Sequence, residues 1–197
     1  MFDAIKNSLF EAEHICLAPI QPESDAVIEA RWTQDASYLR MLDREPARPS
    51  SPEQVKKLYD AIEKSVEEDG KLFYFTIRLR RDDRLIGFAR IFWIQWTMGR
   101  ASVQLGIGDP EQRGKGYGRE ALSLLVRYAF AELNLFHLGA SVPEYNPVAL
   151  RLFQGAGFTE KACQRQALYR DRRRWDLLIL GLLKDEWRED NGRHLSR

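Results

Sequence analysis

Apolar and polar residues alternate with a period of two from Leu72 to Arg80. This period is typical of a strand with one buried face. After a turn at residues 82–83, the sequence predicts a second strand from Leu85 to Trp96 and a third from Ser102 to Gly108. A short strand is also expected earlier, at residues 14–20. Consecutive strands joined by short turns predict an antiparallel meander.

Apolar residues recur every three to four positions just before the meander, which indicates a helix. Ser51, Pro52 and Gln54 supply the N-cap, the first-turn proline and the partner of a capping box, and Gly70 ends the helix. The apolar stripe behind this cap consists of Val55, Leu58, Tyr59, Ile62 and Val66. Ser24 is the expected N-cap of an earlier helix that runs to about residue 36.

Helices and strands alternate in the second half of the chain. The expected elements are a helix at 118–133, a strand at 137–142, a helix at 147–154 and strands at 158–169 and 174–183. With the meander, they predict a mixed α/β fold, a mostly antiparallel central sheet with flanking helices. We expect one domain over residues 1–187 and a polar, flexible tail over residues 188–197.

Charge and composition exclude several classes of function. The 30 Lys+Arg and 29 Asp+Glu residues give a formal net charge of +1, which argues against a nucleic-acid-binding protein. The three histidines are scattered and the two cysteines lie far apart, so no metal site is expected. The chain shows no leader pattern and no apolar run long enough for a membrane. We therefore expect a cytoplasmic protein without membrane partners.

A glycine-rich turn between the third meander strand and the next helix is the most informative segment. Gly114, Gly116 and Gly118 permit positive φ and close backbone approach at a helix N-terminus. The N–H groups and the helix dipole there favour an anion such as a pyrophosphate. Three cations surround the turn: Arg113, Lys115 and Arg119.

Three other interpretations fit this turn less well. A Walker-type loop requires Ser or Thr after Lys115, where the chain has Gly116. A dinucleotide fingerprint matches Gly116, Gly118 and Ala121, but it follows three meander strands and lacks an acidic residue about 20 positions on. A connection without a ligand leaves the three glycines and three cations of the turn unexplained.

Two motifs give the chain a family resemblance. Arg113-x-x-Gly116-x-Gly118 is similar to the (Gln/Arg)-x-x-Gly-x-(Gly/Ala) motif of the GNAT superfamily of N-acetyltransferases. Asn146-x-x-Ala149, followed by Gly-Phe at residues 157–158, resembles the second signature of this superfamily. The order of elements agrees over about residues 14–185. The segment 168–176 most resembles the branch of ribosomal-protein N-terminal and spermidine N-acetyltransferases.

This resemblance implies that acetyl-CoA, as co-substrate, lies in a V-shaped split between the two central strands. Its pantetheine arm would pair with the free strand edge at 105–108, and an N–H near Ile107 would polarise the thioester carbonyl. Its pyrophosphate would contact the backbone at 113–119. The implied cofactor-binding residues are Leu105, Gly106, Ile107, Gly108, Arg113, Gly114, Lys115, Gly116, Tyr117, Gly118, Arg119, Asn146 and Phe153.

The chain departs from the family at the residues that usually move protons. Phe153 stands where many members have a tyrosine acid, and Gln104 where many have a glutamate base, so Gln104 is expected only to orient a water. Glu144 and Tyr145 are candidate replacements for the base and the acid, or else an exposed loop carboxylate and a core tyrosine. Three aromatic residues either line an acceptor pocket or pack in the core: Phe92, Trp93 and Trp96.

Two hypotheses for function follow. The first is an N-acetyltransferase that transfers an acetyl group from acetyl-CoA to the primary amine of a small molecule or a peptide N-terminus by direct attack. The second is an acyl-CoA-binding sensor or scaffold with little turnover, which Phe153 and Gln104 keep open. The acceptor side is expected at residues 32–50, whose three acidic residues and three arginines cancel, unlike a site for a polycation such as spermidine. The sequence leaves open whether two chains form a homodimer.

Overall fold

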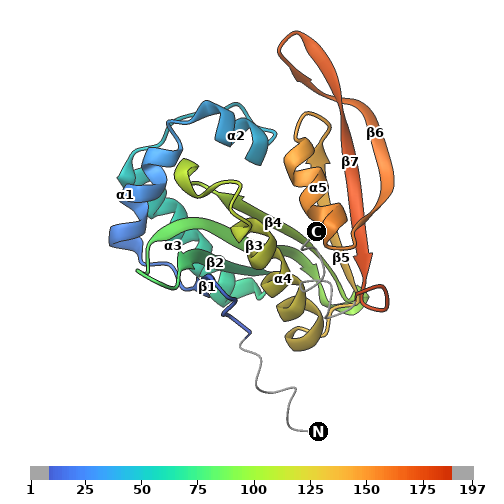
Figure 1. Cartoon of the computed structure of the whole chain (residues 1–197), viewed down its shortest axis with the longest axis horizontal. Coiled ribbons are helices and arrows are strands. Elements are labelled where there is room, and N and C mark those ends of the chain that lie inside the picture. The colour runs from blue at the N-terminus through green and yellow to red at the C-terminus, as the bar shows by residue number, and fades with distance from the viewer. Residues whose placement is uncertain (1–8, 188–197) are drawn as a thin grey trace, which may run out of the picture.

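The computed structural model describes residues 9–187, so the predicted tail at 188–197 lies outside the described residues. Its seven strands form one sheet in the order β1-β2-β3-β4-β5-β7-β6 (Figure 1). Neighbouring strands are antiparallel except β4 and β5, which are parallel. The strands are β1 (Ile15–Ala18), β2 (Leu72–Leu79), β3 (Leu85–Gln95), β4 (Arg100–Ile107), β5 (His137–Pro143), β6 (Thr159–Arg170) and β7 (Arg173–Leu183). The predicted mixed sheet is confirmed.

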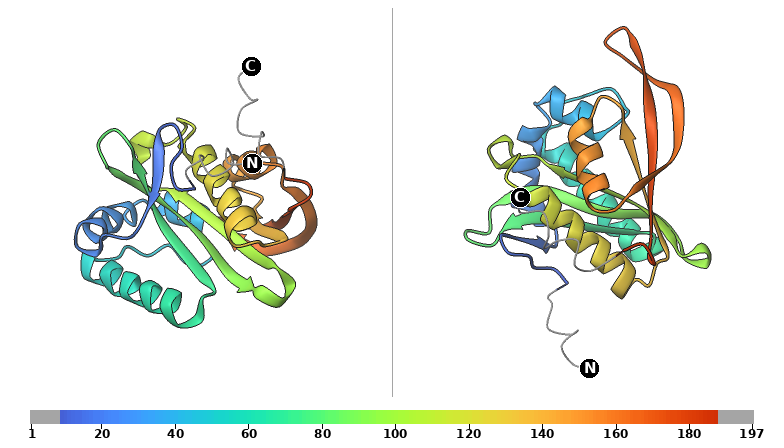
Figure 2. Two further views of the ribbon diagram at one scale, coloured as in Figure 1. Left: turned by 90° about the horizontal axis from the view of Figure 1, so that it is seen from below. Right: turned by 45° about the vertical axis from the view of Figure 1, so that its right-hand side comes forward.

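Helices cover both faces of this sheet. They are α1 (Pro22–Trp32), α2 (Ala36–Leu42), α3 (Pro52–Asp69), α4 (Tyr117–Arg127) and α5 (Pro147–Gly155), and α4 continues into a π-helical turn at Tyr128–Glu132. Figure 2 (left) shows α1 and α3 on one face and α4 on the other. The larger apolar core lies between the sheet, α4 and α5, and a smaller one lies between α1 and α3.

The period-two pattern divides β2 between these two cores. The rings of Phe73 and Phe75 meet Tyr128, beyond the end of α4, at centroid distances of 5.6 and 5.4 Å. Tyr74, which lies between them in the sequence, points the other way and stacks on Phe88 of β3 at 5.6 Å. The ring of Tyr74 also meets Tyr59 of α3 edge-on. The face that carries Tyr74 and Phe88 therefore lies under α1, α2 and α3.

The first helix differs from its prediction. It begins at Pro22 rather than behind Ser24, because proline suits the first helical position and Asp25 accepts a hydrogen bond from Gln21 N at 2.8 Å. It ends at Trp32 rather than near residue 36.

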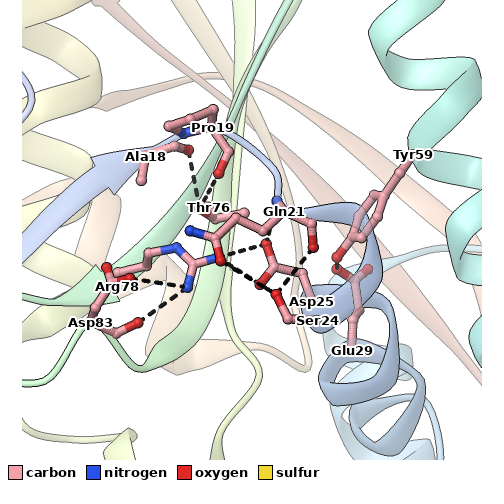
Figure 3. A network of polar contacts seen from close by, with 10 residues as sticks. All are labelled: Ala18, Pro19, Gln21, Ser24, Asp25, Glu29, Tyr59, Thr76, Arg78 and Asp83. Carbon is pink, nitrogen blue, oxygen red and sulfur yellow. Dashed lines mark hydrogen bonds and ion pairs between the residues drawn. The ribbon is translucent and has the colours of Figure 1, made fainter.

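A buried ion pair holds α1 against the sheet (Figure 3). Arg78 Nη2 of β2 donates to Asp25 Oδ1 and Oδ2 at 2.6 and 2.7 Å. The two side chains are only 5% and 1% exposed. Arg78 also donates to the carbonyl of Asp83 at 3.1 Å. The pair fixes which face of α1 points toward the sheet.

The second helix, α2, was not predicted from the sequence. Asp35 is its N-cap and accepts a hydrogen bond from Tyr38 N at 3.1 Å. No residue of α2 is fully buried. Because little apolar surface holds α2 in place, its position depends on hydrogen bonds from other elements.

The two central strands pair over only part of their length. Arg100–Ser102 of β4 pairs with His137–Gly139 of β5, and no pairing joins the rest of these two strands. From residue 103 onward, β4 therefore has a free edge on its β5 side. This is the predicted V-shaped split.

Of the two alternatives for the aromatic run, core packing is wrong for two of its members. Trp93 and Trp96 are 66% and 49% exposed, respectively. The register of β3 and β4 shifts between Phe92 and Gln95, and Trp93 has a φ of +54° there. This bulge interrupts the alternation of faces on which the prediction depended.

Candidate functional site

The loop between β4 and α4 carries the glycine-rich motif. Asp109 accepts a hydrogen bond from Glu111 N at 3.0 Å and begins a 3-10 turn, Pro110–Gln112. Gly114 and Gly116 then have φ values of +75° and +91°, which side chains disfavour. A Cβ atom at either position would meet no protein atom within 4 Å. The loop therefore borders open space.

Backbone N–H groups at the start of α4 face that open space. Within residues 9–187, the N–H groups of Gly116, Tyr117 and Gly118 donate to no protein group. Gly118 lies between β4 and α5, with a Cβ position 3.8 Å from both Leu105 and Leu152. Free N–H groups at a helix N-terminus, together with the helix dipole, make an anion-binding site. This cradle fits a pyrophosphate.

The free edge of β4 leads directly to this cradle. Gly108 N donates to Ile86 O of β3 at 2.9 Å. Because alternate residues of an antiparallel strand point their backbone groups to opposite edges, Leu105 and Ile107 direct theirs toward the split. Gly108 itself must be glycine, since a Cβ atom there would lie 2.0 Å from the Trp32 ring. An extended chain could pair with this edge, as expected for a pantetheine arm.

Arg113 holds the end of β4 through its side chain. Its Nε donates to Ile107 O at 3.0 Å, and its Nη2 donates to Gly108 O at 2.8 Å. Its Nη1 forms an ion pair with Asp35 at 3.0 Å. The Tyr38 N–H, followed by the Arg113 guanidinium, lowers the pKa of Asp35. Arg113 thus joins β4 to the start of α2. The other two cations of the turn, Lys115 and Arg119, are exposed.

The start of α5 closes the split from the other side. Asn146 Oδ1 accepts from Ala149 N at 3.0 Å and caps α5, while its Nδ2 donates to Met41 O of α2 at 3.1 Å. Phe153, further along α5, is 6% exposed, and its ring meets that of Phe158 at 5.1 Å. Asn146 therefore both caps a helix and contacts α2.

Comparison with known proteins identifies the family. Residues 14–159 match the family model of the acetyltransferase (GNAT) domain. The chain belongs to the GNAT family. It is therefore an N-acetyltransferase with acetyl-CoA as its co-substrate, which supports the first of the two functional hypotheses.

Similar proteins share this assignment. An uncharacterised N-acetyltransferase of prophage origin from Bacillus subtilis is 23% identical over 180 residues, 91% of this chain and 96% of its own. Spermidine N-acetyltransferase from Vibrio cholerae, solved with CoA and spermine, has a TM-score of 0.75 at 22% identity, over 87% of this chain and 96% of its own. Ribosomal-protein-S5-alanine acetyltransferase from Vibrio fischeri also has a TM-score of 0.75, at 23% identity, over 91% and 98%. At this identity the two structures support the fold alone.

The three candidate proton-transfer residues of this GNAT enzyme have protein partners. Gln104 accepts from Arg90 Nε at 2.8 Å and donates to Leu42 O at 2.7 Å. Glu144 accepts from Asp176 N at 3.1 Å and lies 3.6 Å from Arg173 in the β6–β7 hairpin. Their catalytic roles stay predictions.

Tyr145, the third candidate, reaches α2. Its hydroxyl donates to Arg40 O at 3.2 Å, and its ring meets Trp175 edge-on at 5.6 Å. Burial raises the pKa of Tyr145, so its hydroxyl keeps its proton near neutral pH. Tyr145, Asn146 and Gln104 thus all donate hydrogen bonds to carbonyl groups of α2.

Sequence reasoning did not single out the polar residues that lie between the sheet and the helices α1 and α2. Tyr38, Glu29, Tyr74 and Arg90 are all only partly buried there. A methyl group added at Gly106 would come within 2.9 Å of the Tyr38 hydroxyl, so this hydroxyl lies over β4 at the split. The signal that was available was the spacing of Asp25 and Glu29, which places both carboxylates on one face of α1.

A cavity of about 450 Å³ borders the glycine-rich loop on its α1 side. It is lined by Ile28, Arg31, Trp32, Asp35, Arg84, Leu85, Gly108, Asp109, Pro110 and Arg113. None of the residues 114–119 contributes to it, so this cavity is separate from the proposed pyrophosphate cradle.

Proposed function

We propose that the enzyme acetylates the primary amine of a small molecule or a peptide N-terminus by direct attack of that amine on acetyl-CoA. Acetyl-CoA supplies the acetyl group as a thioester. The observation that carries the proposal is the free edge of β4, which runs into the glycine-rich loop. Within the described residues, the N–H groups of Gly116, Tyr117 and Gly118 in this loop and the start of α4 lack protein partners. Direct transfer requires both reactants to meet at one point, which the split between β4 and β5 supplies.

In this proposal the backbone does most of the binding. The N–H groups at 114–118 hold the pyrophosphate, and the edge at 105–108 pairs with the pantetheine arm. Ile107 N–H, directed toward the split, stabilises negative charge on the thioester oxygen. Asn146 and Phe153 on α5, with the cations of the turn, complete the proposed cofactor site.

The acceptor amine loses its proton before or during attack. An alkyl amine with a pKa near 10.4 is mostly protonated at neutral pH. Phe153 has no proton to exchange, and Gln104 is neutral. We therefore propose that water removes the proton, with Glu144 as the candidate base and Tyr145 as the candidate acid if a side chain takes part.

The charge around α2 supports an acceptor with a single amine. Among residues 32–50, Asp35 is paired with Arg113, and Arg40 is paired with Asp171 at 2.6 Å. A polyamine needs surplus carboxylates, because each ammonium that leaves water requires a partner. Relatives of this chain include spermidine N(1)-acetyltransferases from Vibrio cholerae and Escherichia coli. We propose that this chain differs from them in its acceptor.

Steady-state kinetics test this proposal. CoA release is measured with spermidine, an N-terminal peptide and a panel of small primary amines. We expect turnover with monoamines and a lower kcat/KM for spermidine. A kcat/KM for spermidine at least tenfold above every other acceptor would overturn the charge argument. CoA binding without turnover on any amine would favour an acyl-CoA sensor instead.

The location and assembly of the enzyme are also proposals. No helix within residues 9–187 is long and apolar enough to cross a membrane. We propose that the enzyme works in the cytoplasm, without nucleic-acid or membrane partners. Sedimentation velocity distinguishes a monomer of 22.9 kDa from a homodimer.

A further inference from the structure

A row of polar side chains crosses the sheet beneath α1 and α2. Tyr74 of β2, Arg90 of β3 and Gln104 of β4 are aligned in register, so their side chains share one face. The next row on the same face contains Phe88 and Gly106. Tyr74, Arg90 and Gln104 lie in the middle of a covered sheet, yet each keeps part of its surface accessible. Solvent therefore reaches part of each of these three side chains.

Within residues 9–187, Arg90 lacks the carboxylate partner that a partly buried arginine usually has. Its Nε donates to the neutral Gln104 Oε1 at 2.8 Å, and its guanidinium lies 4.8 Å from the centre of the Phe92 ring. Among residues 9–187, no carboxylate forms an ion pair with it, and neither Nη group has a hydrogen-bond partner. Arg78, on the same sheet face, is instead held by both oxygens of Asp25. Burial lowers the pKa of Arg90.

Glu29 is the carboxylate that faces this region from α1. It lies one helical turn after Asp25, and one of its oxygens accepts a hydrogen bond from Tyr59 of α3 (Figure 3). Its other oxygen has no partner in the part of the chain that the structure describes. Burial raises the pKa of Glu29, while the Tyr59 hydroxyl and the Arg90 charge lower it. Tyr59, which is bonded to Glu29, meets the ring of Tyr74 edge-on, and Tyr74 is the register partner of Arg90. Glu29 therefore lies close to the row without forming an ion pair with Arg90 among the described residues.

Glu29 and Arg90 are close to the proposed place of acetyl transfer. Gly106 follows Gln104 by two residues on β4, a rise of about 7 Å. The Tyr38 hydroxyl lies over Gly106 and has no hydrogen bond to another group of residues 9–187. Burial, followed by the Glu29 charge, raises the pKa of Tyr38. Tyr38 therefore offers a neutral donor between Glu29 and the split.

We infer that Glu29 and Arg90 together bind the acceptor, and that the acceptor carries a carboxylate near its reactive amine. This inference rests on the proposed function and names its substrate class. Arg90 would bind the carboxylate through its two free Nη groups, a geometry that guanidinium groups favour. Glu29 would bind the ammonium form of the amine before it is deprotonated. The carboxylate of the acceptor would then pair with Arg90, and its ammonium would pair with Glu29.

Other acceptor classes fit this arrangement less well. A polyamine would bring further positive charge against Arg90, which costs free energy in a poorly solvated site. A simple alkyl amine would pair with Glu29 and leave Arg90 unpaired. The carboxylate can come from a free amino acid or from the side chain of an N-terminal Asp or Glu residue in a peptide.

Matched acceptors test the inference. We compare a free amino acid with its amide, and a peptide amide beginning with Asp with one beginning with Asn. In each pair that the site accepts, kcat/KM should be at least about tenfold higher for the carboxylate, as expected for a hydrogen-bonded charge. The two pairs distinguish the free amino acid from the peptide. Equal kcat/KM within both pairs would overturn the inference while leaving acetyl transfer intact.

Variants assign the two roles. In Arg90→Gln, the preference for the carboxylate should fall to near one, while the Kd for CoA stays unchanged. Glu29→Gln can still accept the Tyr59 hydrogen bond, and it should raise KM for the amine without removing the carboxylate preference. Arg100→Gln, at an exposed position of β4, is the matched control and should keep the preference. Persistence of the preference in folded Arg90→Gln would contradict the role of Arg90.

A binding measurement removes the dependence on turnover. Calorimetry of the CoA-loaded wild-type enzyme should detect binding of a carboxylic acid that lacks the amine. It should detect no binding of the corresponding amide. Absence of binding by carboxylic acids matched to both acceptor pairs would contradict the inference, even if no amine is acetylated. Absence of turnover with every amine, with carboxylate binding retained, would instead count against the proposed acetyl transfer.

Discussion

At Gly116 the backbone adopts a φ of +91°, and open space lies where a side chain would begin. Valine at this position would strain the loop and project toward the proposed pyrophosphate site. We expect Gly116→Val to raise the Kd for CoA by about tenfold or more, equivalent to ~1.4 kcal/mol. Isothermal titration calorimetry measures this directly.

Two further variants separate strain from binding. Gly70 has a φ of +56° and equally open surroundings, but it ends α3. Gly70→Val should therefore lower stability and leave the Kd for CoA unchanged. Arg113→Ala should weaken CoA binding less than Gly116→Val, because the Arg113 guanidinium is already bonded to β4 and Asp35. Unchanged CoA affinity in folded Gly116→Val would falsify the placement of the pyrophosphate.

Substitution of Glu144 gives the clearest test of the proposed proton transfer. It is bonded to Asp176 N and lies beside Arg173, so it has a structural role in the β6–β7 hairpin. We expect Glu144→Gln to retain turnover. In the wild type, kcat/KM should rise with pH toward the pKa of the acceptor amine, without a bell-shaped profile. Rates measured between pH 6 and 10 check this, and loss of turnover with intact CoA binding would make Glu144 the base.

At the scale of elements, α2 depends on the β6–β7 hairpin for its position. Arg170 donates to the carbonyls of Arg40, Asp43 and Glu45 at 2.8, 2.7 and 3.0 Å. Because α2 has no fully buried residue, loss of these bonds should loosen it, although Tyr145, Asn146 and Gln104 still bond to its carbonyls. We expect Arg170→Ala to speed amide hydrogen exchange in α2 and to raise KM for the acceptor, with little change in the Kd for CoA.

The same hairpin offers a control for this variant. Arg174 bonds to Gln166 O at 3.3 Å, within the hairpin itself. Arg174→Ala removes a cation of the hairpin without touching α2, so hydrogen exchange in α2 should stay as in the wild type. Equal exchange in Arg170→Ala and Arg174→Ala would show that other contacts hold α2.

The docking of α1 on β2 is a second interaction between elements that can be tested. Removal of Asp25 leaves the Arg78 charge buried without a partner, so Asp25→Ala should lower the free energy of unfolding by about 3–5 kcal/mol. The double variant Asp25→Leu/Arg78→Met removes both charges and should lose less. Urea unfolding measures both values. A double variant no more stable than Asp25→Ala would mean that the charge itself is not the source of the loss.

At the scale of the whole molecule, the site is assembled from distant parts of the chain. Asp35 meets Arg113, and Met41 O accepts a hydrogen bond from Asn146. The β6–β7 hairpin extends beyond the body of the molecule beside α5 and reaches α2 near its tip (Figure 1). One side of the sheet, with α4 and α5, therefore belongs to the proposed cofactor site, and the other, with α1 and α2, to the proposed acceptor site.

Local signals in the sequence were sufficient for most of the fold. The alternation in β2, the capping box at Ser51 and the glycine motif at Gly114–Gly118 depend on residues close together in the chain, so their structures follow from neighbouring residues alone. The helix α2 was missed because it is short, has no apolar stripe and is held from outside. The sequence left Trp93 between a pocket and the core, because a bulge that no local pattern marks changes which way a strand residue points.

The sequence by itself determined the sheet, the helices α1, α3, α4 and α5, and the loop proposed to bind the pyrophosphate. Only the tertiary structure decided which charges meet on the acceptor side. Arg78 and Arg90 are both arginines at alternating strand positions, yet one is paired with Asp25 and the other has no ion-pair partner within residues 9–187. That difference depends on strand register and on how α1 lies across the sheet. These are relations between residues more than 50 positions apart, which no local pattern encodes.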